Sequence, residues 1–460
     1  MSEKTKSIWN NKRIATLTLG CKVNQYETDG MRELLEQTGA VFVDFEQEAD
    51  IYLINTCSVT NMAERKSRQM LHRAKKCNPQ AIVVAVGCYV QTMPEEVLKD
   101  LSVDLVVGNN RKKDIVAILE QFMERCGERH TEEDAEHGSE QEKEAAYNYQ
   151  WLDINQKQEY ENLTITHMSE HTRAYIKIQD GCNQFCSYCI IPYVRGRIRS
   201  RKPEEIIQEV KKLAEAGCKE VVLTGIHLSS YGKDWKDDEV NSSRLDGTAL
   251  LDLLQAISEI DGILRIRMGS LEPRIMTEEF VTGLKKLPKV CPHFHLSLQS
   301  ACNETLKRMN RKYTIEEYME SCDRLRTAFD RPALTTDVIV GFPGETQEEF
   351  ETTCRNLEQL NLYEMHIFKY SKRRGTVAET MPNQVAEEEK NRRSDILLAM
   401  TAKQKQEYED SFKGESLQIL IEERIEKDGE NWYVGHTERY MKVEVKAETD
   451  IRNQIVSVIR

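Results

Sequence analysis

The sequence has no hydrophobic run long enough to cross a membrane, and residues 1–13 are polar and charged rather than an apolar secretion signal. We therefore expect no membrane partner. In a 460-residue chain without such a signal, 13 cysteines indicate a reducing compartment, where thiols stay free or bind metal. The expected location is cytoplasmic.

The sequence also lacks the positive charge that is common in nucleic-acid-binding proteins, because its net charge is −13. This charge is unevenly distributed. Residues 128–170 contain twelve acidic and three basic side chains, a net charge of −9, so the rest of the chain carries only −4. The acidic balance belongs mostly to one segment and leaves RNA binding open elsewhere.

Cys182, Cys186 and Cys189 follow the spacing C-x3-C-x2-C. A structural zinc site needs four ligands, and only the last two cysteines are spaced as a zinc pair. A disulfide framework is typical of small secreted domains, and a chance group of buried cysteines is the remaining alternative. Three thiolates from one loop can bind three irons of a cluster and leave the fourth iron open to a small molecule. We therefore interpret the motif as an iron–sulfur site.

Residues 12–125 alternate short β-branched runs with amphipathic segments, which predicts a doubly wound α/β domain with a parallel sheet. A helix is expected over 61–76, with Asn61 and Glu64 forming a capping box. The expected strands are 14–19, 51–55, 81–86 and 105–107. Residues 126–167 are acidic and without periodicity, and we interpret them as a partly mobile linker.

Residues 168–398 repeat a strand–helix unit. The expected strands are 174–179, 220–224, 264–269, 293–298, 334–340 and 364–370. Six units are too few for a closed eight-stranded barrel and suit an open partial (β/α)6 barrel. Residues 401–460 end in short runs at 417–422, 432–437, 442–445 and 455–458, which predict a small β-barrel.

Cys21, Cys57 and Cys88 each follow an expected strand of the N-terminal domain. Since the carboxyl ends of parallel strands converge on one crevice, these thiols can meet despite separations of 36 and 31 residues. The alternative is that they are small buried residues at strand ends. Because all three occupy the same topological position, we favour a second metal site.

The cysteine triplet matches the motif of the radical S-adenosylmethionine (SAM) superfamily. Over nearly the whole chain the sequence resembles the methylthiotransferases within it. The resemblance is carried by Gly20-Cys21-Lys-Val-Asn24-Gln-Tyr-Glu27, Asn55-Thr-Cys57, Gly87-Cys88, Gly225-Ile-His-Leu-Ser-Ser-Tyr-Gly232 and Gly435-His-Thr-Glu-Arg-Tyr440. The last of these is similar to the RNA-binding TRAM domain. Within the family, the chain is most similar to enzymes acting on N6-threonylcarbamoyladenosine at position 37 of tRNA.

The resemblance implies SAM and two [4Fe–4S] clusters as cofactors. It makes Cys182, Cys186 and Cys189 the ligands of the radical-generating, catalytic cluster, and Cys21, Cys57 and Cys88 the ligands of an auxiliary cluster that supplies sulfur. One SAM would methylate that sulfur, and a second would yield the radical that lets a methylthio group replace hydrogen at carbon 2 of adenine. Contacts with SAM are expected at the carboxyl ends of barrel strands, from Thr224, Gly225, Ser270, Glu272, Ser297 and Gln299.

The expected partners are the anticodon loop of tRNA, a reductant protein such as flavodoxin or ferredoxin, and a sulfur donor. Two basic runs near the expected site predict phosphate contacts, from Arg195, Arg197, Arg199, Arg201, Lys372, Arg373 and Arg374. Three alternatives remain open at this point. They are an enzyme acting on N6-isopentenyladenosine, one acting on a ribosomal protein, and a non-catalytic RNA-binding iron–sulfur protein or cluster carrier.

Overall fold

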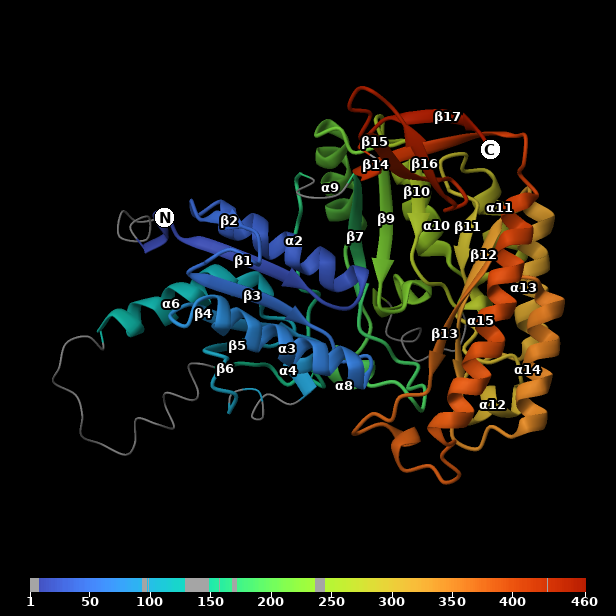
Figure 1. Ribbon diagram of the computed structural model, residues 1–460, viewed down its shortest axis with the longest axis horizontal. Coiled ribbons are helices and arrows are strands. Elements are labelled where there is room, and N and C mark those ends of the chain that lie inside the picture. The colour runs from blue at the N-terminus through green and yellow to red at the C-terminus, as the bar shows by residue number, and fades with distance from the viewer. Residues whose placement is uncertain are drawn as a thin grey trace. The chain divides into compact units, whose positions relative to one another are not determined.

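The computed structural model describes residues 8–92, 97, 99–128, 149–156, 158–167, 172–235, 245–427 and 429–460. The chain divides into two compact units (Figure 1). The N-terminal unit comprises residues Met1–Ile165 and Cys189–Arg199, and the C-terminal unit comprises Thr166–Tyr188 and Ser200–Arg460. We describe each unit by itself.

The N-terminal unit is built on a parallel sheet in the order β2-β1-β3-β4-β5-β6. Its strands are β1 (Arg13–Thr18), β2 (Val41–Val43), β3 (Ile51–Thr56), β4 (Ile82–Gly87), β5 (Leu105–Val107) and β6 (Tyr149–Gln150). Its helices are α2 (Lys22–Glu36), α3 (Asn61–Cys77), α4 (Cys88–Thr92), η1 (Lys112–Asp114), α6 (Ile115–Glu128) and α8 (Ile191–Val194). The predicted doubly wound domain is confirmed, with each predicted strand within one residue of its observed bounds.

Two hydrophobic cores cover the two faces of this sheet. On one face, α2 and α6 contribute side chains such as Met31, Leu35 and Phe122. On the other, α3 and α4 contribute Leu71 and Val90. The central strand β3 is buried along its whole length. This explains why its sequence is a continuous apolar run rather than an alternating one.

Two local predictions for this unit need correction. The helix predicted over 61–76 is present, but its cap is Thr60, whose hydroxyl accepts a hydrogen bond from the Ala63 amide at 3.1 Å. The predicted capping box of Asn61 and Glu64 is therefore wrong by one position. The short edge strand β2 was not predicted, because three residues are too few to show a period.

The acidic segment 126–167 lies partly outside the described residues, which omit 129–148 and 157. Its later part is not a solvated linker, because Leu163 and Glu161 are buried in the N-terminal unit. The Tyr26 hydroxyl donates to the Leu163 carbonyl at 2.5 Å, and Glu161 accepts from the Lys113 amide at 3.1 Å. A few apolar side chains spaced through polar sequence thus fix this segment to the domain before it.

The C-terminal unit contains an open partial barrel of parallel strands. These are β7 (Arg173–Asp180), β9 (Glu220–Gly225), β10 (Arg265–Met268), β11 (His293–His295), β12 (Ala333–Val340) and β13 (Glu364–Lys369). One sheet runs β10-β9-β7-β8, where β8 is Arg199–Ser200, and the other runs β11-β12-β13. Isolated bridges Ile266↔Val290 and Leu271↔Leu296 connect them. The six predicted barrel strands are all present.

Helices cover the outer side of this barrel, and Figure 1 shows α11, α13, α14 and α15 stacked beside β11–β13. The α-helices are α9 (Pro203–Glu215), α10 (Thr248–Ser258), α11 (Glu278–Lys285), α12 (Asn303–Arg308), α13 (Ile315–Ala328), α14 (Gln347–Leu360) and α15 (Glu387–Asp410). The short 3-10 helices are η2 (Leu228–Ser230), η3 (Lys233–Trp235), η4 (Pro273–Ile275) and η5 (Val377–Glu379). Pro203 begins α9, where its missing amide proton costs no helical hydrogen bond.

The chain ends in a four-stranded antiparallel sheet in the order β16-β15-β14-β17, which forms half of a barrel. Its strands are β14 (Ser416–Lys427), β15 (Glu430–Thr437), β16 (Lys442–Lys446) and β17 (Ile455–Ile459). Figure 1 shows this sheet beside the starts of β7, β9 and β10. The predicted terminal β module is therefore present as an open sheet.

Buried arginines attach this sheet to the amino ends of the barrel strands. Arg267 on β10 donates to both Glu220 on β9 (3.0 Å) and the Glu438 carbonyl (3.0 Å). Tyr440 stacks between His293 and His436, with ring centroids 5.0 and 4.4 Å apart. Burial alone would raise the pKa of Glu220, but Arg267 and the other nearby guanidinium groups hold it below its usual value. The charges inside the barrel are therefore paired.

Replacing Arg267 with alanine should lower the free energy of unfolding by about 3 kcal/mol, because it leaves the buried Glu220 carboxylate short of its main partner. We expect the low end of the usual range, since Arg173 and Arg265 also lie within 3.8 and 3.9 Å of Glu220. Urea unfolding of the full chain measures this change. Lys403→Ala, which removes an exposed pair with Glu407, is the matched control and should change the value by less than about 0.5 kcal/mol.

Candidate active site

Cys21, Cys57 and Cys88 lie at one edge of the N-terminal sheet. Cys57 directly follows β3, Cys88 directly follows β4, and Cys21 precedes α2 just beyond β1. These three strands are parallel neighbours, so their carboxyl ends share an edge. The sheet order reverses direction between β1 and β3, which is where doubly wound folds bind ligands. The structure thus brings the predicted auxiliary cysteines to the expected crevice.

The three thiols also influence one another. A Cβ atom on Gly20 would lie 2.8 Å from Cys57 Sγ, so the backbone before Cys21 passes directly against the second thiol. Gly20 has φ +104°, a conformation that favours glycine. Burial raises the pKa of Cys57 to about 11, and the charges of Cys88 and Cys21 act in the same direction. Such a group suits iron, because the positive ions favour the thiolate form.

Arg195 lies inside this site and has no exposed surface. Its Nε donates to Cys88 Sγ at 3.3 Å, and its two terminal nitrogens donate to the Glu27 carboxylate at 2.7 and 3.1 Å. Glu27 is equally buried. A guanidinium enclosed in this way does not reach an RNA phosphate. The prediction that Arg195 binds RNA is therefore wrong, and the residue instead holds the Cys88 thiol in place.

Asn24 and Lys112 complete the surroundings of this arginine. Asn24 Oδ1 accepts from Arg195 Nη2 at 2.7 Å and lies 3.9 Å from Cys21 Sγ. Lys112 Nζ provides a second cation 3.1 Å from Glu27. Our reading of the sequence assigned no role to these residues. The sequence pattern that could have indicated a role is the spacing of Asn24 and Glu27, which lie three positions apart on one helix face directly after Cys21.

In the C-terminal unit, Cys182 and Cys186 lie in the loop after β7. Burial raises the pKa of Cys182 to about 12. Arg311 Nη1 donates to Cys186 Sγ at 3.3 Å. The Asn310 side chain holds this loop by donating to the Phe185 carbonyl at 2.9 Å. Phe185 itself adopts φ +50°. A partly buried loop with two thiols, one of them bonded to a guanidinium, fits an anionic iron–sulfur cluster. Cys189 begins the part of the chain that belongs to the N-terminal unit, and its ligand role stays a prediction.

The predicted SAM contacts follow strands β9, β10 and β11. Thr224 and Gly225 end β9, and the Gly225 backbone packs against Gln179 of β7, whose Oε1 accepts from the His227 amide at 2.7 Å. The carbonyl of Ser297 accepts hydrogen bonds from Arg311 (3.2 Å) and from the Tyr313 hydroxyl (2.5 Å). Gln299 lies beyond it at φ +74°, and Ser270 is exposed. Their contacts with SAM stay predictions.

Glu272 is the most constrained of these candidates. It is buried, and its carboxylate pairs with His227 Nε2 at 2.8 Å and with Arg274. Burial works to raise its pKa, but the hydrogen bonds from His227 and Arg274 outweigh this and hold the pKa at about 2. Its charge also acts on Cys182 and Arg311. Glu272 therefore places a permanent negative charge near the cysteine loop.

Comparison with known proteins places these sites in a family. The family model described as "Radical SAM superfamily" matches residues 176–357. The family model described as "Uncharacterized protein family UPF0004" matches residues 13–108. The chain is 41% identical over 446 residues to the threonylcarbamoyladenosine tRNA methylthiotransferase MtaB of Bacillus subtilis, covering 97% of this chain and 93% of that protein. The chain belongs to the radical SAM methylthiotransferase family.

Two further relatives and one solved structure are also similar to this methylthiotransferase. The MtaB protein of Aquifex aeolicus is 39% identical over 94% of this chain and 98% of that protein. A tRNA-2-methylthio-N(6)-dimethylallyladenosine synthase of Thermoanaerobacter is 33% identical over 96% of this chain and 92% of that protein. Among solved structures, the radical SAM methyltransferase TsrM of Kitasatospora setae has a TM-score of 0.53 at 15% identity, covering 78% of this chain and 73% of that chain, which supports the fold alone.

Family membership confirms the predicted cofactors, which are SAM and two [4Fe–4S] clusters. The residues described above fit both clusters. One site offers three converging strand ends with glycine at Gly20 and Gly87, where the backbone approaches closely. The other offers a partly buried cysteine loop in which Arg311 donates to Cys186. The iron-ligand role of each cysteine in this methylthiotransferase stays a prediction.

The structure divides the predicted RNA-binding residues into two groups. Arg201 is buried and pairs with Glu209, and Arg199 and Arg373 are also buried, so none of these three presents its charge to a phosphate. The prediction is wrong for them, as it is for Arg195. Charge runs in sequence overestimate surface charge, because alternate side chains point inward. Three residues of the set are exposed, namely Arg197, Lys372 and Arg374.

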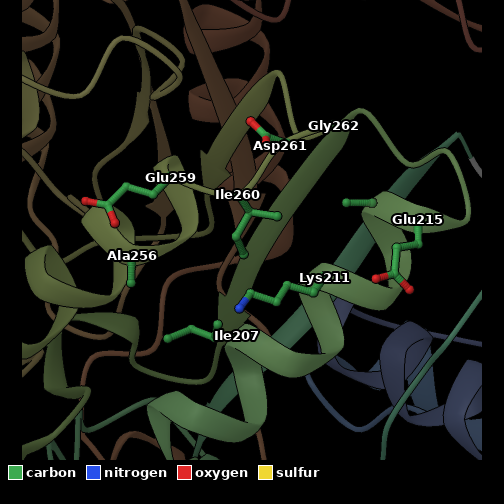
Figure 2. A pocket seen from close by; sticks show the side chains of 9 residues that line it. Ile207, Lys211, Glu215, Ala256, Glu259, Ile260, Asp261 and Gly262 are labelled. Atoms are coloured by element: carbon green, nitrogen blue, oxygen red, sulfur yellow. The ribbon is translucent and has the colours of Figure 1, made fainter.

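A cavity of about 750 Å3 lies away from these sites (Figure 2). It is lined by the end of α9, including Lys211 and Glu215, and by the end of α10 with the loop to Gly262. That loop precedes β10, so the cavity lies at the amino ends of the strands. The predicted SAM contacts lie at the opposite, carboxyl ends, and the cavity is not part of the candidate site.

Within the described residues, every helix is too short or too polar to cross a bilayer.

Arg195→Lys should lower the reduction potential of the auxiliary cluster. The substitution keeps the charge but removes the N–H that Cys88 Sγ accepts, and such hydrogen bonds stabilise a reduced cluster. Loss of one hydrogen bond of roughly 0.5–1.5 kcal/mol corresponds to roughly 20–65 mV. A redox titration followed by electron paramagnetic resonance measures it in a chain with Cys182, Cys186 and Cys189 replaced by alanine. Arg197→Lys is the control, and an equal shift in both variants would contradict the role of Arg195.

Proposed function

We propose that this chain methylthiolates carbon 2 of N6-threonylcarbamoyladenosine at position 37 of tRNA, next to the anticodon. The observation that carries the substrate assignment is the difference in similarity between relatives. The relatives named for threonylcarbamoyladenosine are 34–41% identical over nearly the full chain, against 32–34% for the dimethylallyladenosine synthases. Adenine in a tRNA loop is unpaired, so it can leave the stack and enter a protein site.

Bound together, SAM and the two clusters supply a carbon radical and a methylthio group. The chain's own residues hold these groups and control their surroundings. Cys21, Cys57 and Cys88 bind the auxiliary cluster, with Arg195 donating to Cys88. Cys182, Cys186 and Cys189 would hold the radical cluster, and three protein ligands would leave room for SAM to bind it. With only three ligands at each site, both clusters keep an open position for chemistry.

Recognition of tRNA relies on exposed cations and on the terminal β sheet. Arg197, Lys372 and Arg374 have side chains at the surface and make phosphate contacts in this proposal. The reaction also requires a low-potential reductant protein, such as flavodoxin or ferredoxin, and a sulfur donor. These partners work in the cytoplasm, where the thiols stay reduced. The alternative substrate is N6-isopentenyladenosine, and the alternative class is a non-catalytic cluster carrier.

Replacing Cys21, Cys57 and Cys88 together with alanine should remove one cluster's iron and sulfide and abolish methylthiolation. Cleavage of SAM should continue, because the radical cluster has its own ligands. Iron and sulfide analysis and 5'-deoxyadenosine release with dithionite measure the two effects. Cys77→Ala, a partly exposed cysteine outside both sets, is the control. Unchanged iron in the triple variant would refute the auxiliary site, and no 5'-deoxyadenosine from the wild type would refute the enzyme.

Deletion of the gene should remove methylthio-threonylcarbamoyladenosine from cellular tRNA, as measured by mass spectrometry of its nucleosides. The unthiolated nucleoside should accumulate in the same amount. Wild-type chain should restore the modification and the Cys182→Ala variant should not, although Cys77→Ala should. Loss of only the isopentenyl form would show that the substrate assignment is wrong while leaving the chemistry intact.

A further inference from the structure

Three potential metal ligands, none of them a cysteine, lie together on neighbouring strands of the barrel. His295 is on β11, Asp337 on β12 and His366 on β13. The strand register explains the grouping, because Asp337 pairs with His366 across β12 and β13 and His295 pairs with Thr335, two residues before Asp337. Side chains two apart on a strand share a face. One ligand atom from each residue lies within 4.8 Å of the other two.

The spacing of these atoms suits a small cation. His295 Nε2 lies 3.4 Å from Asp337 Oδ2, and two ligands at about 2.05 Å from a tetrahedral zinc ion are about 3.3 Å apart. His295 Nε2 is buried and makes no hydrogen bond among the described residues. The His295 and His366 rings lie nearly parallel, with centroids 5.8 Å apart. The ligand nitrogen of the exposed His366 lies within 4.8 Å of both other ligand atoms.

A hydrogen bond on the other side of His295 favours this use of Nε2. Its Nδ1 lies 3.0 Å from Thr335 Oγ1. When Nδ1 carries the proton and donates to this hydroxyl, the lone pair of Nε2 faces the Asp337 carboxylate. With a neutral imidazole, these are two acceptors 3.4 Å apart, and either a proton on Nε2 or a cation between them makes the contact favourable. Support of a metal-binding histidine through its second nitrogen is a regular feature of metal sites.

The three residues lie on the same face of the sheet as the cysteine loop. Ile339, two residues beyond Asp337, packs in a cluster with Tyr188 of that loop. Thr335, two residues before Asp337, contacts His293, which in turn contacts Arg267 of β10. The site therefore lies on the inner face of the barrel, between the buried arginine network and the cysteine loop.

We propose that His295, Asp337 and His366 bind one divalent transition-metal ion, of which zinc is the best match. Two imidazoles and one carboxylate are the ligand set of open zinc sites, in which water completes the coordination. Partial exposure of Asp337 and His366 leaves room for that water. This ion is separate from both iron–sulfur clusters and does not depend on which nucleoside is the substrate.

Zinc content of the assembled full-length protein tests the proposal. After anaerobic reconstitution of both clusters, the protein is incubated with excess zinc, desalted, and analysed for zinc, iron and sulfide. We expect one zinc per wild-type chain and none in the His295→Gln/His366→Gln variant, with equal iron and sulfide in both. His72→Gln, at an exposed histidine that bonds to Asp100, is the matched control and should retain the zinc.

A second variant and a spectroscopic measurement address misfolding and binding to stray thiols. His366→Gln changes an exposed ring and should leave the fold intact while lowering zinc affinity at least about tenfold. X-ray absorption at the zinc edge should show nitrogen and oxygen neighbours with imidazole scattering. Zinc retained equally by the double variant, sulfur in the first coordination shell, or no zinc in the wild type would each overturn the proposal.

Discussion

Parallel pairing of strands is the constraint on which both candidate sites depend. Parallel strands place all their carboxyl ends at one edge of the sheet. Strand pairing therefore brings residues that are far apart in sequence together, even when these residues do not bind each other. In the N-terminal unit this pairing assembles Cys21, Cys57 and Cys88 after β1, β3 and β4. In the C-terminal unit it sets the predicted SAM contacts after β9, β10 and β11 beside the cysteine loop after β7.

Buried charge is the second feature common to the two units. Arg195 and Arg267 are both enclosed, and each is bound by a carboxylate, Glu27 in one case and Glu220 in the other. An unpaired charge at either position would be strongly destabilising, so each arginine is fixed by its partner. This fixation gives Arg195 a defined direction toward Cys88 and lets Arg267 attach the terminal sheet to the barrel. Arg195, which suggested RNA binding in the sequence, thus serves internal organisation.

Much of the architecture could be predicted because it follows from local patterns. The strands of the N-terminal domain are apolar runs that fit a sheet covered on both faces, and the spacing of Cys182, Cys186 and Cys189 suits one loop. Edge strand β2 and the burial of Leu163 could not be predicted, because a three-residue strand and an isolated apolar residue show no period. Thr60 as the cap of α3, in place of Asn61, depended on backbone angles that the sequence does not specify.

The sequence by itself determined the two cysteine sets, the order of the domains and the family, because these depend on residue types, spacing and periodicity. Only the tertiary structure decided which basic residues face inward. Arg195 and Arg197 are two positions apart, yet one is enclosed beside Cys88 and the other is exposed. The structure likewise brought His295, Asp337 and His366 together across three strands. Both outcomes depend on the packing of distant segments, and such long-range contacts leave no periodic signal in the chain.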